Sequence, residues 1–515
     1  MAPDPDHFDV IIVGAGLSGI GMAHHLQRRS PWATYAILEA RQAIGGTWDL
    51  FRYPGIRSDS DMHTLGYSFR PWCDPDAIAE GHKIRDYIED TAIEAGIDRH
   101  IRFGTKVTHA AWSSKDAHWR VEAADGSVRT CRFLILCSGY YSYDRANRPS
   151  WDGEESFAGA IVEPQFWPGD LDWRGRRVAV IGSGATAVTL VPALAKDAAH
   201  VTMVQRSPSY VMARPSRDKI AKALERVLPL RTAAGLTRWK NVLLQQFFFR
   251  LARRRPAKVR AKLLELTERE VGADQVRHFT PRYNPWDQRL CLAPDGDLFA
   301  AIRAGTAAVA TGEIERFTPS GLRLADGTDL PADIIVAATG LHVQLAGGAT
   351  LSVDGKAVRL GDTMAYKGLF FSDVPNFASI FGYTNASWTL KADLSAAFLC
   401  RVLNRMRRRG EVVVMPRRDP AIVERPFLDF TSTYVRRALG DLPTQGDRGP
   451  WRLRQSYAAD LMNLRFGRLA DGVLTFTPLP QAGGEEPRSG DRGGPVHESN
   501  SPVPAPSRKR EGSFS

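Results

Sequence analysis

The sequence of 515 residues contains only five cysteines, and no two of them are closely spaced. Because there is no CxxC pair, neither a redox dithiol nor a zinc site is supported, and we expect no bound metal. Cysteine use of this kind is typical of a reducing compartment, so we expect a cytoplasmic protein. No apolar run approaches the ~20 residues of a transmembrane helix. The polar start, from Met1 to Asp9, does not resemble a signal peptide.

The composition is that of a globular protein, with 43% hydrophobic and 24% charged residues. This length predicts two or three domains. The net charge of +11 is concentrated in one segment, 214–262, which has 15 Lys/Arg against Asp218 and Glu225 and is therefore +13 by itself. Such a segment favours an anionic membrane, an acidic cofactor or nucleic acid. No nucleic-acid-binding motif accompanies it, so we expect no nucleic-acid partner.

The N-terminal region has the pattern of a dinucleotide-binding unit. The buried-strand pattern 8–13 leads into the loop Gly14-Ala15-Gly16-Leu17-Ser18-Gly19, a helical pattern follows, and a second strand, 35–38, ends at Glu39. In this arrangement the glycines bring a pyrophosphate to the helix N-terminus, and an acid about twenty residues on binds a ribose hydroxyl. The loop alone is a weak signal, but both strands and Glu39 at the right spacing make it strong.

A second unit of the same kind begins at strand 177–181. Its loop reads Gly182-Ser183-Gly184-Ala185-Thr186-Ala187, and the next strand, 201–204, is followed by Gln205-Arg206 instead of an acid. An acid would repel a 2′-phosphate, whereas a guanidinium binds it with paired hydrogen bonds. The first unit is therefore expected to bind FAD and the second NADPH. The alternative for Arg206 is a solvated arginine at a strand end.

These patterns predict an α/β fold with two Rossmann-like dinucleotide-binding domains. We place the first part of the FAD domain at 1–150, the NADPH domain at 151–330 with a helical insertion at 214–290, and the second part of the FAD domain at 331–480. The tail 481–515 is Gly, Pro, Ser and charge, which predicts disorder.

Within the insertion, residues 239–262 combine an apolar cluster (Val242, Leu243, Leu244, Phe247, Phe248, Phe249 and Leu251) with Arg253-Arg254-Arg255. The pattern favours a helix whose apolar side faces the protein core and whose arginine end is solvated. A basic amphipathic helix on a membrane surface is the alternative, so a peripheral membrane contact through 239–262 stays open.

The stretch from Gly45 to Asp59 reads GGTWDLFRYPGIRSD. It resembles a fingerprint of Baeyer–Villiger monooxygenases: Gly or Ala, Gly, x, Trp, four residues, Tyr or Phe, Pro, Gly or Met, three residues, Asp. Together with the two nucleotide units, it makes 8–475 resemble class B flavin monooxygenases of the Baeyer–Villiger branch, in particular the ethionamide-type FAD-containing monooxygenases. The resemblance implies an NADPH-dependent flavoprotein monooxygenase.

The resemblance also assigns residues to the two cofactors. Implied for FAD are Gly14, Gly16, Ser18, Gly19, Glu39, Gly46, Thr47, Trp48, Asp49, Leu50, Asp59 and Val107; implied for NADPH are Gly182, Ser183, Gly184, Ala185, Thr186, Ala187, Val188, Gln205 and Arg206. The catalytic cation of the family matches Arg289, and its expected partner is Asp59. Asp287 is the rival partner, and a structural ion pair is the alternative role of Arg289. Trp388 and Asn385 either border the substrate space or pack in the core.

A second family fingerprint, Phe-x-Gly-x-x-x-His-x-x-x-Trp-Pro, matches Phe157 to Pro168 except at its histidine, which here is Glu163. In the family this histidine is thought to couple the two nucleotide domains during NADPH oxidation. A carboxylate at neutral pH cannot donate the hydrogen bond that a histidine can. The exchange therefore favours a slower or leakier oxygenase.

The mechanism implied by the resemblance inserts one oxygen atom of O₂ into a ketone, through a C4a-peroxyflavin, and gives an ester or lactone. A fixed cation stabilises the oxyanion that develops. Three alternatives stay open: S- or N-oxygenation of a thioether or amine, an uncoupled NADPH oxidase-like flavoprotein, and a non-catalytic nucleotide-sensing or membrane-docked scaffold.

Overall fold

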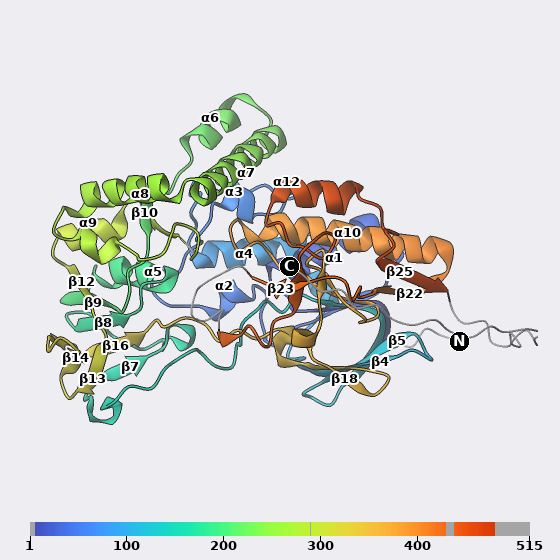
Figure 1. The fold of residues 1–515 in the computed structure, drawn as a ribbon, viewed down its shortest axis with the longest axis horizontal. Helices are drawn as coiled ribbons and strands as arrows, with labels where there is room; N and C mark the ends of the chain where they lie inside the picture. Colours follow the sequence, from blue (N-terminus) through green and yellow to red (C-terminus); the bar gives the residue numbers. More distant parts are fainter. Residues whose placement is uncertain (1–5, 289, 429–436, 479–515) are drawn as a thin grey trace, which may run out of the picture. The chain divides into compact units, whose positions relative to one another are not determined.

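Two separate sheets carry the two glycine-rich loops in the computed structural model, which describes residues 6–288, 290–428 and 437–478 (Figure 1). The predicted disordered tail 481–515 and Arg289 lie outside the described residues. All described residues belong to one unit, 1–478.

The first sheet joins the N-terminal region to residues that follow the second sheet in sequence. Its strands are β1 (His7–Val13), β2 (Tyr35–Leu38), β3 (Ile101–Arg102), β4 (Val107–Ser113), β5 (His118–Ala123), β6 (Val128–Leu136), β17 (Thr350–Val353), β18 (Lys356–Val358), β19 (Ala365–Tyr366), β20 (Phe370–Phe371) and β21 (Phe377–Ser379). Strands β3, β2, β1, β6 and β21 are parallel neighbours in that order. The last four residues of β1 are fully or almost fully buried, as expected of a strand covered on both faces.

The second sheet is entirely parallel, in the order β12-β9-β8-β16-β7. Its strands are β7 (Ala160–Val162), β8 (Arg177–Ile181), β9 (His200–Gln205), β12 (Ala307–Thr311) and β16 (Ile334–Ala337). A three-stranded sheet of β13 (Ile314–Thr318), β14 (Gly321–Leu324) and β15 (Asp329–Pro331) lies between β12 and β16 in sequence. The second sheet thus continues to residue 337, past the predicted boundary at 330; the division into domains stays a prediction.

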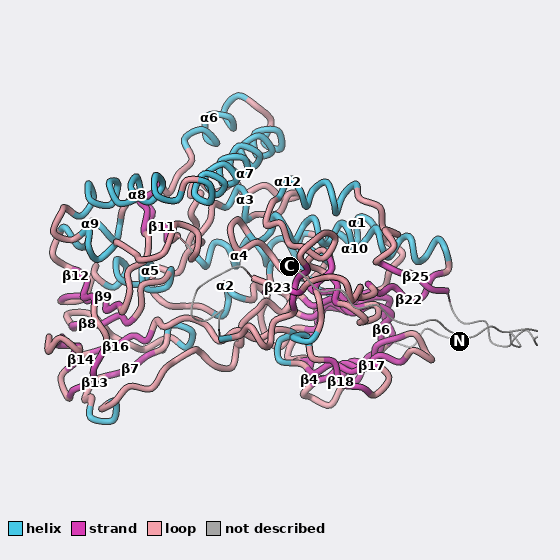
Figure 2. The backbone as a smooth tube through the Cα atoms, viewed as in Figure 1, coloured by secondary structure: helices cyan, strands magenta, loops and turns pink. Residues whose placement is uncertain are grey.

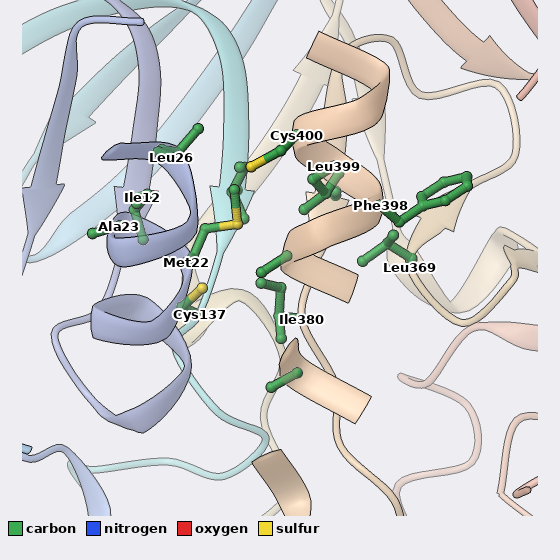
Figure 3. Close-up of a cluster of buried hydrophobic side chains, with 14 of the residues drawn as sticks. Ile12, Met22, Ala23, Leu26, Cys137, Leu369, Ile380, Phe398, Leu399 and Cys400 are labelled. Atoms are coloured by element: carbon green, nitrogen blue, oxygen red, sulfur yellow. The ribbon is translucent and has the colours of Figure 1, made fainter. Parts of the chain in front are cut away.

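Helices α1 (Leu17–Arg29) and α10 (Trp388–Arg409) pack against each other in the core of the first sheet. Figure 3 shows Met22 and Leu26 of α1 facing Leu399 and Cys400 of α10, with Cys137 below them. All five of these residues are buried. Residues almost 380 positions apart therefore share one apolar core, which fixes the start of α1 relative to the start of α10.

The remaining helices flank the sheets or form the insertion. They are α2 (Thr47–Leu50), α3 (Met62–Leu65), α4 (Gly81–Glu94), α5 (Ala185–Leu194), α6 (Lys219–Val227), α7 (Leu230–Arg254), α8 (Pro256–Val271), α9 (Asp297–Arg303) and α12 (Tyr457–Asp460). Strands β10 (Val211–Arg214) and β11 (Cys291–Pro294) pair with each other, β22 (Glu411–Pro416) with β25 (Leu474–Pro478), and β23 (Glu424–Pro426) with β24 (Thr444–Gly446). Three helices in a row, α6 to α8, occupy the predicted insertion between β10 and β11 (Figure 2).

The α/β prediction is confirmed. The favoured interpretation placed the apolar side of the 239–262 helix against the core. In the structure, Leu243, Leu244, Phe247 and Phe248 are exposed and do not face the core. Periodicity identifies which residues share a helix face, but it does not say which face meets the protein.

Candidate active site

A cavity of about 1120 Å³ brings the two glycine-rich loops together. Both loops lie at the carboxyl ends of parallel strands, where ligands bind in open α/β sheets. The predicted residues on its surface are Gly14, Gly16, Ser18, Glu39, Gly46, Thr47, Trp48, Asp59, Val107, Gly182, Ser183, Gly184, Ala185, Thr186 and Arg206. Residues from 13 to 442 contribute to the lining, so folding assembles the site from distant segments.

Backbone contacts require glycine in the first loop. Gly14 has φ +105°, and a Cβ added at Gly19 would lie 1.9 Å from the Gly14 oxygen. The close approach leaves the N-terminus of α1 open toward the cavity, where its free N–H groups and positive end can bind a pyrophosphate. Gly19 itself is buried beneath the loop and does not line the cavity, so its predicted role is indirect.

Glu39 stands at the end of β2 with only 5% of its surface exposed. Its two carboxylate oxygens accept hydrogen bonds from the backbone N–H of Ala15 (2.6 Å) and of Arg41 (2.9 Å). Burial raises the pKa of this carboxyl, and the two backbone hydrogen bonds oppose that rise. Glu39 therefore orders the glycine loop and presents acceptor oxygens at the cavity surface, as a ribose site requires.

The fingerprint stretch around α2 contains residues that line the cavity and residues that do not. Gly46, Thr47 and Trp48 line the cavity, and Thr47 Oγ1 accepts a hydrogen bond from the Tyr141 hydroxyl at 2.6 Å. Asp49 and Leu50 do not line the cavity, and their predicted flavin contact stays a prediction.

Asp49 is instead a buried structural anion. Its carboxylate binds Arg41 at 2.5 Å and Arg52 at 2.7 Å. Burial alone would raise the pKa of Asp49, but the two guanidinium groups lower it overall. Asp49 therefore holds the loop in place and makes no contact across the cavity.

Three tyrosines on the cavity surface were not predicted from the sequence: Tyr140, Tyr141 and Tyr143. The rings of Tyr141 and Tyr143 are stacked, with centroids 5.5 Å apart, and burial raises the pKa of Tyr143 to about 12. They follow β6 and its small-residue exit, Cys137-Ser138-Gly139. Their position directly after the end of a parallel strand could have identified these tyrosines in the sequence, because the carboxyl ends of parallel strands border the site.

The second loop has the same constraint and more open space. Gly182 has φ +145°, and a Cβ there would lie 2.3 Å from the Ala338 oxygen. At Gly184 a Cβ would meet nothing within 4 Å, so the loop leaves room for a ligand beside it. Ser183 donates a hydrogen bond to the Ser207 oxygen (3.0 Å) and accepts one from the Ser209 hydroxyl (3.1 Å). This hydroxyl cluster suits the phosphates of a dinucleotide.

Ala187 and Val188 are 0% and 1% exposed inside α5 and do not line the cavity. Their side chains support the loop from below, and the predicted contact of both residues with NADPH stays a prediction. Their burial fits the third small residue of such a loop, which lets the helix pack close to the sheet.

Arg206 and Gln205, adjacent at the end of β9, behave differently. Arg206 is exposed and lines the cavity beside Ser207. Gln205 is 2% exposed, and its amide donates to the His278 oxygen (2.7 Å) and to Thr311 Oγ1 (2.9 Å). The Gln205 side chain therefore points into the protein, and its predicted cofactor contact stays a prediction.

Arg289 lies outside the described residues, but its chain neighbours do not. Gln288, Cys291 and Leu292 line the cavity, as does Asp59. Asp287, the rival partner, binds Arg253 at 2.6 Å. Trp388 also lines the cavity, whereas Asn385 does not and donates its amide to the Gln455 oxygen at 3.0 Å. The catalytic pairing of Arg289 with Asp59 stays a prediction.

Sequence comparison decides the family. FAD-containing monooxygenase EthA of Mycobacterium tuberculosis (strain ATCC 25618 / H37Rv) is 54% identical over 92% of this chain and 99% of its own length. The chain belongs to the FAD-containing monooxygenases. FAD-containing monooxygenase EthA of Mycolicibacterium smegmatis is 51% identical over 92% of this chain and 97% of its own length. Residues 11–227 also match the family of pyridine nucleotide-disulphide oxidoreductases.

Solved structures share the fold of this monooxygenase at low identity. An oxidized steroid monooxygenase bound to NADP matches with a TM-score of 0.68 and 23% identity, over 80% of this chain and 88% of that one. An open crystal structure of cyclohexanone monooxygenase matches with a TM-score of 0.67 and 22% identity, over 80% and 90%. The predicted α/β fold is confirmed. FAD is the cofactor that the family name gives, and NADPH stays the predicted ligand of the second loop. The open space at Gly184 and the glycine cradle at Gly14 fit these cofactors.

Proposed function

We propose that this monooxygenase is of the Baeyer–Villiger type and inserts one oxygen atom of O₂ into a ketone to give an ester or lactone. The observation that carries the proposal is that Asp59, Gln288 and Cys291 line the same cavity as the fingerprint residues Gly46, Thr47 and Trp48. A guanidinium in that segment, oriented by Asp59, would stabilise the negative charge of a developing oxyanion. The name of one solved neighbour, a cyclohexanone monooxygenase, supports a ketone as substrate.

The other cavity residues would bind and orient the two cofactors. FAD, once reduced by NADPH, supplies the activated oxygen. The Gly14–Gly19 loop with Ser18 would hold the pyrophosphate of FAD, and Glu39 would bind its ribose. Thr47 and Trp48 would lie beside the isoalloxazine ring, and Val107 beside the adenine. The Gly182–Thr186 loop would hold the pyrophosphate of NADPH, and Arg206 its 2′-phosphate. Tyr140, Tyr141 and Trp388 supply apolar surface that excludes water from this space.

Oxygenation of a thioether or amine is the second candidate, and the exchange to Glu163 in the linker fingerprint adds partial uncoupling to hydrogen peroxide. The discriminating experiment supplies purified protein with NADPH and either cyclohexanone or thioanisole, and measures ester, sulfoxide and hydrogen peroxide. Arg289→Ala is expected to keep flavin reduction by NADPH and to lower ester formation by about 100-fold or more, the usual loss when one oxyanion-stabilising group is removed.

Arg282→Ala is the matched control, because Arg282 is an exposed arginine in the same segment that does not line the cavity. It is expected to form ester at the wild-type rate. Ester formation retained in Arg289→Ala would contradict the role of Arg289. Sulfoxide without ester from the wild-type protein would select the second candidate.

A further inference from the structure

Helix α7 presents a wholly apolar face to solvent. Between residues 236 and 248, every position of α7 that is exposed holds a large apolar side chain: Leu236, Trp239, Leu243, Leu244, Phe247 and Phe248. We refer to these six residues as the apolar face of α7. Leu243 is 63% and Phe247 is 59% exposed. Isolated exposed apolar residues are common, but a contiguous set of six on one helix marks a surface that meets something apolar.

The opposite side of the same helix is polar and is held by the protein. Asn241 and Gln245 donate side-chain hydrogen bonds to the two carboxylate oxygens of Asp61, each at 2.9 Å. Arg238 donates to the Gly66 oxygen at 2.7 Å. A helix of a globular domain normally has the reverse arrangement. These hydrogen bonds fix the rotation of α7, so its apolar face is directed outward by specific contacts.

The helix pair α6 and α7 lies within the most basic segment of the chain. Segment 214–262 has 15 Lys/Arg, and of its two acids Asp218 binds Lys240 at 2.5 Å. Exposed arginines stand at both ends of the apolar face: Arg231 before it, and Arg250, Arg254 and Arg255 after it. The neighbouring helix α6, which packs on α7, adds exposed Ile220 and Val227 beside its own lysines. Figure 1 shows the two helices projecting together from the rest of the described chain.

We propose that α6 and α7 lie on an anionic phospholipid bilayer, with the apolar face of α7 at the headgroup–acyl boundary and the arginines among the anionic headgroups. Apolar residues on one side with flanking cations are the arrangement of interfacial helices, and each cation near such a surface adds attraction. Across the described residues, no helix is both long and apolar enough to cross a bilayer. A second copy of the chain is a poorer occupant, because pairing two such faces would bring two +13 segments together.

The position of α7 connects this surface to the active site. Val242, on the buried side of α7, packs against Tyr383, and Tyr383 lines the cavity. The helix that would rest on lipid therefore also supports the cavity surface. A bilayer in this place would present membrane-dissolved, apolar substrates close to the cavity.

The test measures co-flotation of the full FAD-loaded protein with vesicles. Wild-type protein should float with vesicles of equal parts phosphatidylcholine and phosphatidylglycerol, and much less with phosphatidylcholine alone. The triple variant Leu243→Ser, Phe247→Ser, Phe248→Ser should lower the bound fraction by about tenfold or more, because it removes three large apolar groups from the boundary. Arg250→Glu with Arg254→Glu should lower it several-fold, and wild-type binding should weaken with salt.

Ile93→Ser is the matched control, because Ile93 on α4 is 57% exposed and lies on another helix; it should float like the wild type. Retained FAD absorbance and melting temperature verify that each variant is folded, and Leu243→Ser alone provides a milder version. Absence of wild-type flotation on anionic vesicles overturns the proposal, as does equal flotation of the triple variant. It is also overturned if light scattering finds a lipid-independent dimer that the triple variant dissociates.

Discussion

Trp388 donates its indole N–H to the hydroxyl of Ser18 at 2.8 Å, although 370 positions separate the two residues. Trp388 is the first residue of α10, and Ser18 lies in the first turn of α1, beside the glycine loop. The indole also stacks on Tyr140, with ring centroids 5.5 Å apart. The late part of the chain thus completes the surface around the FAD loop, so the first nucleotide unit is not sufficient for the site by itself.

Trp388→Phe keeps an aromatic ring in the cavity but removes the hydrogen bond to Ser18. Since one such bond contributes about 1 kcal/mol net, FAD should bind about 3- to 10-fold more weakly, as measured by fluorescence titration of the apoprotein. Trp32→Phe is the control, because its indole binds Asn404 at 2.6 Å away from the cavity. If the bond matters, adding Ser18→Ala to Trp388→Phe causes a smaller loss than Ser18→Ala causes in the wild type; fully additive losses would contradict the coupling.

Arg206 and Gln205 allow a matched test of cofactor selection. Arg206→Ala should raise the KM for NADPH by about 10- to 100-fold and leave the KM for NADH nearly unchanged, since charge-assisted bonds to a phosphate are worth about 1.5–3 kcal/mol. Gln205→Leu should leave both KM values unchanged but lower the melting temperature, because its amide holds His278 and Thr311. Equal effects on NADPH and NADH in Arg206→Ala would exclude a phosphate contact.

The parts of the site that the sequence predicted are those with short, local patterns. A glycine whose Cβ would touch backbone, as at Gly14 or Gly182, leaves a mark in the sequence because no other residue fits. The carboxylate of Glu39 is similarly marked by its place after a buried strand. The side-chain directions of Asp49 and Gln205 could not be predicted in this way. Each residue is adjacent to a cavity residue, but its side chain points to the other side, and only tertiary partners determine that direction.

Contacts between distant segments were not predictable. Tyr141 reaches Thr47 across 94 positions, and Trp388 reaches Ser18 only because α1 and α10 share a core. The outward rotation of α7 depends on the Asp61 carboxylate, far away in sequence. In each case the local pattern identified the residues that share a face, while the partner that decides the orientation of that face lies elsewhere in the chain.

His24 should make the protein sensitive to acid. Its ring stacks on Phe69 with centroids 3.6 Å apart, and burial, with the charges of His25 and Arg28, lowers the pKa of His24 to about 4. The unfolded chain takes up this proton near pH 6.5, so between about pH 6.5 and 4 it binds more protons than the folded state. Stability therefore falls as the pH falls through this window, by about 1–2 kcal/mol at pH 5 relative to pH 8.

His24→Phe preserves the stacked ring and removes the proton site, so the loss of stability between pH 7 and 5 should become smaller in urea unfolding. His82→Phe, at an exposed histidine, should leave the acid-dependent loss as it is in the wild type. His63, whose pKa burial also lowers, keeps part of the pH dependence in both variants. An unchanged slope in His24→Phe would mean that His24 does not titrate in this range.

Glu163→His restores the residue of the linker fingerprint and should increase the product formed per NADPH consumed. Glu163 follows β7 and precedes Pro164 and Gln165, and the Gln165 amide donates to the Ser142 oxygen at 2.8 Å, between two cavity tyrosines. A change at 163 can therefore reach the cavity surface through two residues of backbone. Unlike a carboxylate, an imidazole can donate a hydrogen bond at neutral pH.

The measurement is the ratio of ester to hydrogen peroxide at equal NADPH use. Glu155→His, at an exposed acid of the same segment, should leave the ratio unchanged; the same ratio in Glu163→His would show that the exchange has no effect on coupling.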